Sequence, residues 1–301
     1  PDRVRSQCEI PETAEVLYNK KGTAPGFLFE RDGKKIFSLP GVPLEMEHLF
    51  DKYIRPDLKK IQKGVIGHRV IKTVGLTEAS LWEKFGPVEP LERLATVASL
   101  PSYLEMKVRL SCCSKSSEEV EIRLSKAEDM IVSSLGEWIY GKDNDTLEGK
   151  VGELFLENNK TLAVAESCTG GLIGHRLTQT PGSSNYFLEG VVAYSNEAKS
   201  SRLEVSPSLI RKYGAVSEEV ALAMADGVRK TSGADIGLSV TGVAGPDASN
   251  NKPVGTVFIA ISDEEKSDCK YFCFYSDRSR NKERSAQAGL DLLRRWFRNR
   301  I

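Results

Sequence analysis

The sequence predicts an α/β protein: a C-terminal three-layer α/β/α sandwich, preceded by a small α+β middle domain and a partial α/β domain at the N-terminus. Three observations lead to this prediction. Apolar runs of strand length alternate with segments of helical periodicity in the second half of the chain. Turn-forming residues such as Pro181-Gly182 separate these segments. The 301 residues are enough for two or three cores, and we place the domains at 1–62, 63–143 and 144–301.

The first predicted domain contains too few elements for a complete sheet. Residues 19–27 form a turn-rich stretch, residues 35–39 read as an apolar strand, and Pro40-Gly41 ends that strand. The residues that follow predict a helix, because apolar side chains recur at helical spacing. These side chains are Met46, Leu49, Phe50 and Ile54.

The middle domain is predicted as two strands and two helices. Residues 70–74 and 103–110 alternate as strands, whereas 77–85 and 118–135 have helical spacing. We find no catalytic combination of residues in this domain. The polar run 141–145 is the best candidate for a linker to the last domain.

The last domain supplies most of the α/β pattern. Thr146 is a predicted N-cap, and Ser217 caps a helix that runs to Lys230 with acidic residues in its first turn. The closing helix carries apolar residues from Ala286 to Phe297 on one face. Strands are predicted at residues 161–165, 187–194, 235–240, 255–261 and 271–275.

The bulk composition excludes several classes of protein. Lysine plus arginine and aspartate plus glutamate each number 42, so the formal net charge is zero. A balanced charge argues against a protein that mainly binds nucleic acid or an anionic membrane. No apolar run approaches the ~20 residues of a membrane span, and residues 1–5 carry no apolar signal region. We expect a cytoplasmic protein with neither nucleic-acid nor membrane partners.

The cysteines and histidines indicate neither a disulfide framework nor a zinc site. No Cys-x-x-Cys pair occurs among the six cysteines, and the chain contains only three histidines. We therefore expect reduced cysteines, no metal and no organic cofactor. The cysteines are at positions 8, 112, 113, 168, 269 and 273.

The segment 165–171, Ala-Glu-Ser-Cys-Thr-Gly-Gly, joins a predicted strand to a predicted helix that starts near Leu172. Ser167 should lie at the carboxyl end of the strand, where open α/β sheets bind ligands. Backbone N–H groups at such a turn can stabilise a developing oxyanion. The simpler alternative is an ordinary connection in which Thr169 caps the helix.

Six stretches of the last domain follow one another with spacing typical of a known family. They are 165–171, 181–184, 194–199, 214–217, 241–247 and 252–256. Together they closely resemble the C-terminal domain of the CinA (competence/damage-inducible) family. The resemblance implies an amidohydrolase that converts nicotinamide mononucleotide to nicotinic acid mononucleotide and ammonia.

The N-terminal motifs are similar to the end of the molybdopterin-binding-like domain of the same family. That domain is described as an ADP-ribose pyrophosphatase, but its first half has no counterpart here. We therefore expect that this first activity is lost. A partial domain leaves a sheet edge exposed, so we expect a homodimer.

The resemblance assigns the nucleophile to Ser167, the base to Lys199 and assistance in proton transfer to Tyr194. Two other assignments remain open from the residues alone. Ser195 and Lys199 are four apart and would share a helical face, and Cys168 is intrinsically a better nucleophile. His175 would lie roughly 12 Å from Ser167 along a helix, too far to act as base, and His48 and His68 belong to other domains.

The expected substrate is a small nucleotide, and glycine-rich turns should let the backbone approach it. Arg278 and Lys282, one helical turn apart, would hold its phosphate. The family has Arg where Lys282 stands and a glycine pair that residues 247–251 lack. The expected substrate-binding residues are Thr169, Gly170, Gly171, Gly190, Thr241, Gly242, Gly245, Arg278 and Lys282, and the oxyanion would be held near residues 169–171 with Thr241.

Two alternative functions make predictions that differ from those of an amidohydrolase. A nucleotide-binding or scaffold protein would bind the nucleotide without turnover. Residual ADP-ribose hydrolysis would need a divalent metal and give a phosphate product.

Overall fold

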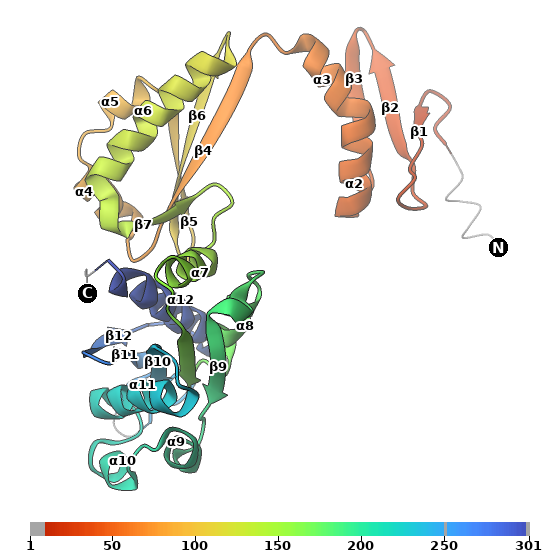
Figure 1. Cartoon of the computed structure of the whole chain (residues 1–301). Coiled ribbons are helices and arrows are strands. Elements are labelled where there is room, and N and C mark those ends of the chain that lie inside the picture. The colour runs from red at the N-terminus through yellow and green to blue at the C-terminus, as the bar shows by residue number, and fades with distance from the viewer. Residues whose placement is uncertain (1–9, 250–251, 299–301) are drawn as a thin grey trace, which may run out of the picture. The chain divides into compact units, whose positions relative to one another are not determined.

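A computed structural model describes residues 10–249 and 252–298 (Figure 1). The expectations about residues 1–5, Cys8 and the end of the 247–251 loop lie outside the described residues. The described chain divides into two compact units. One comprises the described residues up to 65 together with 113–117, and the other comprises the described remainder.

The first unit contains a three-stranded antiparallel sheet in the order β1-β2-β3. The strand predicted at 35–39 is present as β3, one residue earlier than predicted. The predicted apolar stripe from Met46 to Ile54 is also helical, although a π-helical turn interrupts the α-helix. Of the residues in this stripe, Leu49 and Ile54 are buried. The elements are β1 Glu15–Leu17, β2 Gly26–Arg31, β3 Lys34–Ser38, α2 Pro43–Leu49, the π-helix Phe50–Ile54 and α3 Arg55–Ile61.

The second unit begins with a four-stranded sheet in the order β5-β6-β4-β7. The predicted strand 103–110 was placed too early, because residues 102–105 form the turn between β5 and β6, where the Ser102 N–H donates to Glu105 O. The predicted linker 141–145 was also wrong in part, because Gly141 belongs to β7 and pairs with Lys72 of β4. The elements are β4 Val65–Thr73, α4 Glu78–Phe85, α5 Glu89–Glu92, β5 Thr96–Pro101, β6 Met106–Ser114, α6 Ser117–Leu135, the 3-10 turn Gly136–Trp138 and β7 Ile139–Lys142.

The C-terminal part of this unit contains a five-stranded sheet in the order β12-β11-β10-β8-β9. β8 is parallel to both β9 and β10, whereas β10, β11 and β12 are antiparallel. Its strands are β8 Leu162–Glu166, β9 Phe187–Val192, β10 Ile236–Gly242, β11 Thr256–Ser262 and β12 Ser267–Cys273. Its helices are α7 Leu147–Glu157, α8 Leu172–Thr178, α9 Asn196–Leu203, α10 Pro207–Tyr213, α11 Glu218–Ser232 and α12 Arg278–Trp296, with a 3-10 turn at Ser183–Asn185.

Helices cover both faces of this sheet, which confirms the predicted α/β class (Figure 1). Leu162 and Val164 of β8 pack with residues of α7, α8 and α12, whereas Ala163 and Ala165 pack with residues of α9, α10 and α11. α11 packs closely, since a Cβ on Gly237 would lie 2.1 Å from the Ala225 carbonyl oxygen. The layers are therefore helix, sheet and helix, with the main core around α12.

The alternation along β8 decides where the next two side chains lie. Successive strand residues point to opposite faces. Glu166 therefore continues the face of Val164, toward α8, and Ser167 continues the face of Ala165, toward α9. Both placements agree with the hydrogen bonds of these side chains.

Candidate active site

Four loops meet at the carboxyl ends of the parallel strands of the five-stranded sheet. Three of them follow β8, β9 and β10, and the fourth leads into α12. A chain of hydrogen bonds links them, from Ser167 through Lys199 and Tyr194 to Arg278 and Gly245. This edge of an α/β sheet is where ligands usually bind.

Ser167 and Lys199 form a buried pair at the centre of this region. Lys199 Nζ lies 3.0 Å from Ser167 Oγ, and the two side chains come from positions 32 residues apart. The same amine lies 3.0 Å from Ala193 O and 3.4 Å from Tyr194 O. Lys199 is 2% exposed and Ser167 7% exposed.

The amine of Lys199 has no carboxylate partner among the described residues, and its described acceptors are neutral oxygens. Burial disfavours the charged form, so the pKa of Lys199 lies below its ordinary value of 10.5. A buried lysine with a lowered pKa can serve as a general base toward a hydroxyl group in contact with it.

The rival nucleophiles have different environments. Cys168 is buried among apolar side chains, and burial raises the pKa of its thiol to about 12, which disfavours the thiolate. Ser195 is the N-cap of α9, where its side chain accepts a hydrogen bond from the Ala198 N–H at 3.1 Å.

The histidines lie apart from this pair. His175 is exposed on α8, as expected of a surface residue. His68 lies in the middle part of the chain, 2.9 Å from Ser111 Oγ.

The hydroxyl group of Tyr194 does not meet the Ser167–Lys199 pair through any described hydrogen bond. It accepts instead from Arg278 Nη2 at 2.8 Å, and the tyrosine is 60% exposed. Arg278 also donates to Gly245 O, where the chain has a φ of +102° that favours glycine. Tyr194 and Gly245 thus hold the guanidinium group next to the loops that follow β9 and β10.

Lys282, one helical turn after Arg278 on α12, lies beside Gly170. Its Nζ is 3.6 Å from the position that a Cβ would take on Gly170. Asn281, the neighbouring residue of α12, is buried and donates to Ala244 O at 3.0 Å and to Ser276 O at 2.8 Å. These bonds fix the start of α12, whose first two turns carry Arg278 and Lys282.

Glu166 is a residue of this region that our sequence reasoning missed. Its buried carboxylate accepts hydrogen bonds from the N–H groups of Gly171 at 3.0 Å, Ile173 at 3.1 Å and Gly174 at 2.9 Å. The N-cap residue of α8 is Gly171, with a φ of +93°, so the alternative in which Thr169 caps this helix is wrong. A glutamate at the end of an otherwise apolar strand was the available signal.

Several residues expected to bind substrate have other described contacts. Thr241 donates from Oγ1 to Ala215 O at 2.8 Å. A Cβ on Gly242 would lie 2.6 Å from Thr256 O, so that glycine allows two strands to approach. Gly190 pairs with Val164 within the sheet, three residues before Ser167, and faces the Phe187 ring.

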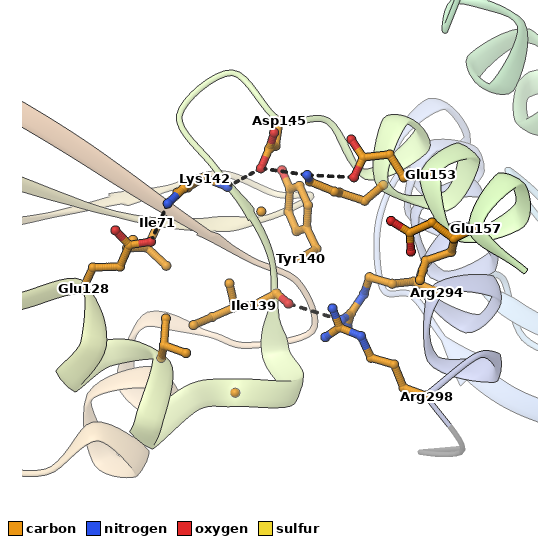
Figure 2. A pocket seen from close by; sticks show the side chains of 15 residues that line it. Ile71, Glu128, Ile139, Tyr140, Lys142, Asp145, Glu153, Glu157, Arg294 and Arg298 are labelled. Carbon is orange, nitrogen blue, oxygen red and sulfur yellow. Dashed lines mark hydrogen bonds and ion pairs between the residues drawn. The ribbon is translucent and has the colours of Figure 1, made fainter. Parts of the chain in front are cut away.

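A cavity of about 410 Å³ lies elsewhere, between the four-stranded sheet with α6 and the helices α7 and α12 (Figure 2). Its charged groups largely satisfy one another: Lys142 pairs with Glu128, and Lys150 pairs with Asp145. None of the predicted site residues lines it. Among residues 10–249 and 252–298, no cluster of three or more His, Cys, Asp or Glu side chains could hold a metal ion.

The described cysteines are all free. No helix within the described part of the chain is long and apolar enough to cross a bilayer.

Comparison with protein families gives two matches. Residues 144–297 match the family model described as the CinA C-terminal domain. Residues 68–141 match the one described as the Damage-inducible protein CinA KH domain.

Individual relatives agree with these matches. A protein of Caldicellulosiruptor saccharolyticus, named as competence-damage inducible, is 42% identical over 302 residues, which cover 99% of this chain and 73% of the relative. A CinA-like protein of Cytophaga hutchinsonii is 42% identical over 97% of this chain and 70% of its own length. A solved structure of a CinA superfamily protein from Klebsiella pneumoniae has a TM-score of 0.50 and 27% identity, and covers 51% of this chain and 96% of its own.

Proposed function

The chain belongs to the CinA family, and from this premise we propose that its C-terminal domain hydrolyses the carboxamide of nicotinamide mononucleotide, giving nicotinic acid mononucleotide and ammonia. One observation carries the proposal: the buried contact of 3.0 Å between Ser167 Oγ and Lys199 Nζ. Covalent cleavage of an amide needs a nucleophile with a base within hydrogen-bond reach. The Ser167–Lys199 pair meets this requirement.

In the first half of the reaction, neutral Lys199 takes the proton of the Ser167 hydroxyl group as Oγ bonds to the carboxamide carbon. The carbonyl oxygen becomes an oxyanion. Lys199 then returns the proton to the amide nitrogen, the C–N bond breaks, and ammonia leaves. An ester between Ser167 and the nicotinoyl group remains.

In the second half, a water molecule replaces ammonia. Neutral Lys199 takes a proton from this water as its oxygen attacks the ester carbon. The bond to Ser167 Oγ breaks, and Oγ recovers a proton from Lys199. The product is a carboxylic acid, which ionises near neutral pH.

We propose that Arg278 and Lys282 bind the 5′-phosphate. Both are cations on the first turns of α12, and neither has a carboxylate partner among the described residues. Arg278 keeps a planar fork suited to a phosphate, while Lys282 adds a point charge. Tyr194, which holds Arg278, acts in this proposal on the guanidinium group as well as in the proton transfer that the family resemblance implies.

The test is ammonia release from nicotinamide mononucleotide by the full chain, with and without a chelator. We expect turnover that resists the chelator. Ser167→Ala should lower kcat by at least about 10³-fold, because it removes the nucleophile. Lys199→Met, which keeps the length of the side chain, should lower kcat by about 10²–10⁴-fold.

Cys168→Ala is the matched control, because it alters the neighbouring nucleophile and should leave kcat within a few-fold. Binding of the nucleotide without ammonia release would contradict the amidohydrolase and favour a binding protein. Metal-dependent release of a phosphate product from ADP-ribose would favour the other activity. Turnover that survives Ser167→Ala but not Cys168→Ala would move the nucleophile to the thiol.

The division into domains at 1–62, 63–143 and 144–301 is likewise our proposal. One family match ends at residue 141 and the next begins at 144, which supports the second boundary.

A further inference from the structure

The turn between β5 and β6 carries an exposed tyrosine that contacts the start of α12. Ser102 closes this turn, because its Oγ donates to Glu105 O at 3.1 Å and accepts from the Glu105 N–H at 3.1 Å. Tyr103, the next residue, is 50% exposed, and its hydroxyl group donates to the Glu283 carboxylate. The centroid of its ring lies 5.8 Å from Cζ of Arg280. The middle part of the chain thus reaches the first two turns of α12.

The middle part also holds the same helix near its far end. There the guanidinium group of Arg294 donates to Ile139 O and to Glu137 O. Between Arg280 and Arg294 a helix rises roughly 21 Å. The contact of Tyr103 is therefore one end of a long interface along α12, which fixes the position of the turn that carries it.

Two carboxylates stand next to the cations that we propose for the phosphate. Asp277 precedes Arg278, and Glu283 follows Lys282. Arg278 and Lys282 are four residues apart and share one face of the helix, whereas Arg280 and Glu283 are three apart and share another. A carboxylate without a partner on this stretch would repel a phosphate or compete with it for a cation.

Each of these carboxylates has its own described partner. Asp277 lies 3.5 Å from Arg280 Nε and also accepts from the Arg280 N–H at 3.0 Å. Glu283 accepts from Tyr103, and this hydrogen bond raises the pKa of the phenol, so that it remains a donor at neutral pH. Without the phenol, Asp277 and Glu283 would share the single guanidinium group of Arg280.

We propose that Tyr103 is a positioning residue for the phosphate site. By holding Glu283 it leaves Arg280 to Asp277, and the two cations proposed for the phosphate stay free of carboxylates. The inference rests on the proposed function, specifically on its phosphate site. Tyr103 acts through the charges of α12 and not on the reacting carboxamide. It therefore favours a nucleotide over the same nucleoside without a phosphate.

The test is calorimetric binding of nicotinamide mononucleotide and of the corresponding nucleoside, which lacks the phosphate. The variants are made in the full chain with Ser167→Ala as background, so that no turnover occurs during the titration. Tyr103→Phe removes only the hydroxyl group and keeps the ring beside Arg280. It should weaken binding of the nucleotide by about two- to fivefold and leave binding of the nucleoside unchanged. The loss should shrink at high ionic strength, because salt screens exposed charges.

Removal of the carboxylate tests the reason for this loss. Tyr103→Phe combined with Glu283→Gln leaves no charge to be released, and should restore binding of the nucleotide. Tyr213→Phe is the control for loss of a tyrosine hydroxyl group. Tyr213 is 37% exposed at the end of α10, which packs on the opposite face of the sheet from α12. This variant should bind both ligands as the background does.

The outcomes separate this inference from the proposed function. A wild-type chain that binds the nucleotide more tightly than the nucleoside but releases no ammonia would overturn the amidohydrolase alone. Equal binding of the two ligands by the background would overturn the phosphate site, and the role of Tyr103 with it. A folded Tyr103→Phe that binds the nucleotide as tightly as the background would overturn the role of Tyr103 alone. So would a loss that Glu283→Gln does not restore, or one that the nucleoside shares.

Discussion

Arg294 allows a quantitative test of how the two sheets of the second unit are joined. Its side chain is 1% exposed, although it belongs to the last turns of α12. The guanidinium group donates to Ile139 O of β7 at 3.2 Å (Figure 2). It also donates to Glu137 O at 2.8 Å, in the 3-10 turn before β7, and to Asp291 Oδ1. Burial lowers the pKa of Arg294, and the neighbouring Asp291 opposes this effect.

Arg294→Met keeps the apolar stem and removes the guanidinium group. Two carbonyl oxygens of half-buried residues then lose a donor, at about 1–3 kcal/mol each. Asp291 retains Arg295 Nε at 2.8 Å, so it is not left alone. We expect a loss of about 3–5 kcal/mol, most of it from the two carbonyl oxygens. For a unit of this size this corresponds to a fall in Tm of roughly 6–20 °C.

The measurement is thermal unfolding of the full chain, followed by calorimetry so that separate transitions are resolved. Arg298→Met is the matched control. Arg298 lines the same cavity, but it is exposed and has no described side-chain partner (Figure 2). Its loss should change stability by no more than about 0.5 kcal/mol. Equal Tm values for the two variants would refute the idea that Arg294 joins α12 to the four-stranded sheet.

Four further predictions concern the C-terminal domain. The kcat/KM for the nicotinamide nucleotide should rise about tenfold per pH unit up to the lowered pKa of Lys199, because only the neutral amine accepts a proton; a flat profile that Lys199→Met does not change would contradict a lysine base. Between that pKa and 10.5 the unfolded chain binds more protons at Lys199 than the folded chain. The free energy of unfolding should therefore rise with pH in this window, by up to about 1.4 kcal/mol per pH unit. Denaturant titration should show this rise in wild type and not in Lys199→Met. Cys168, with a pKa of about 12, should resist alkylation by iodoacetamide at pH 8 in the folded chain, and mass spectrometry showing rapid labelling there would argue against its burial. Gly237→Ala should destabilise the domain by at least about 2 kcal/mol, since its Cβ would lie 2.1 Å from Ala225 O, and a Tm equal to that of wild type would contradict this packing.

The sequence alone determined the elements that depend on local patterns. The apolar run that became β8 and the N-caps at Thr146 and Ser217 are local signals, and the structure has all of them. The family was recognisable because its motifs are short segments in fixed order. Boundaries failed where a turn was decided by pairing, as at residues 102–105 and in β7.

The tertiary structure decided which side chains meet. Ser167 and Lys199 lie 32 positions apart, and they touch because β8 lies between β9 and β10 in the sheet. Glu166 bonds to backbone N–H groups, and Arg294 bonds to two backbone carbonyl groups besides Asp291; backbone partners carry no side-chain signature in the sequence. Local periodicity fixes the face on which a residue lies, but the order of strands depends on packing across the whole core, so these contacts could not be read from any one segment.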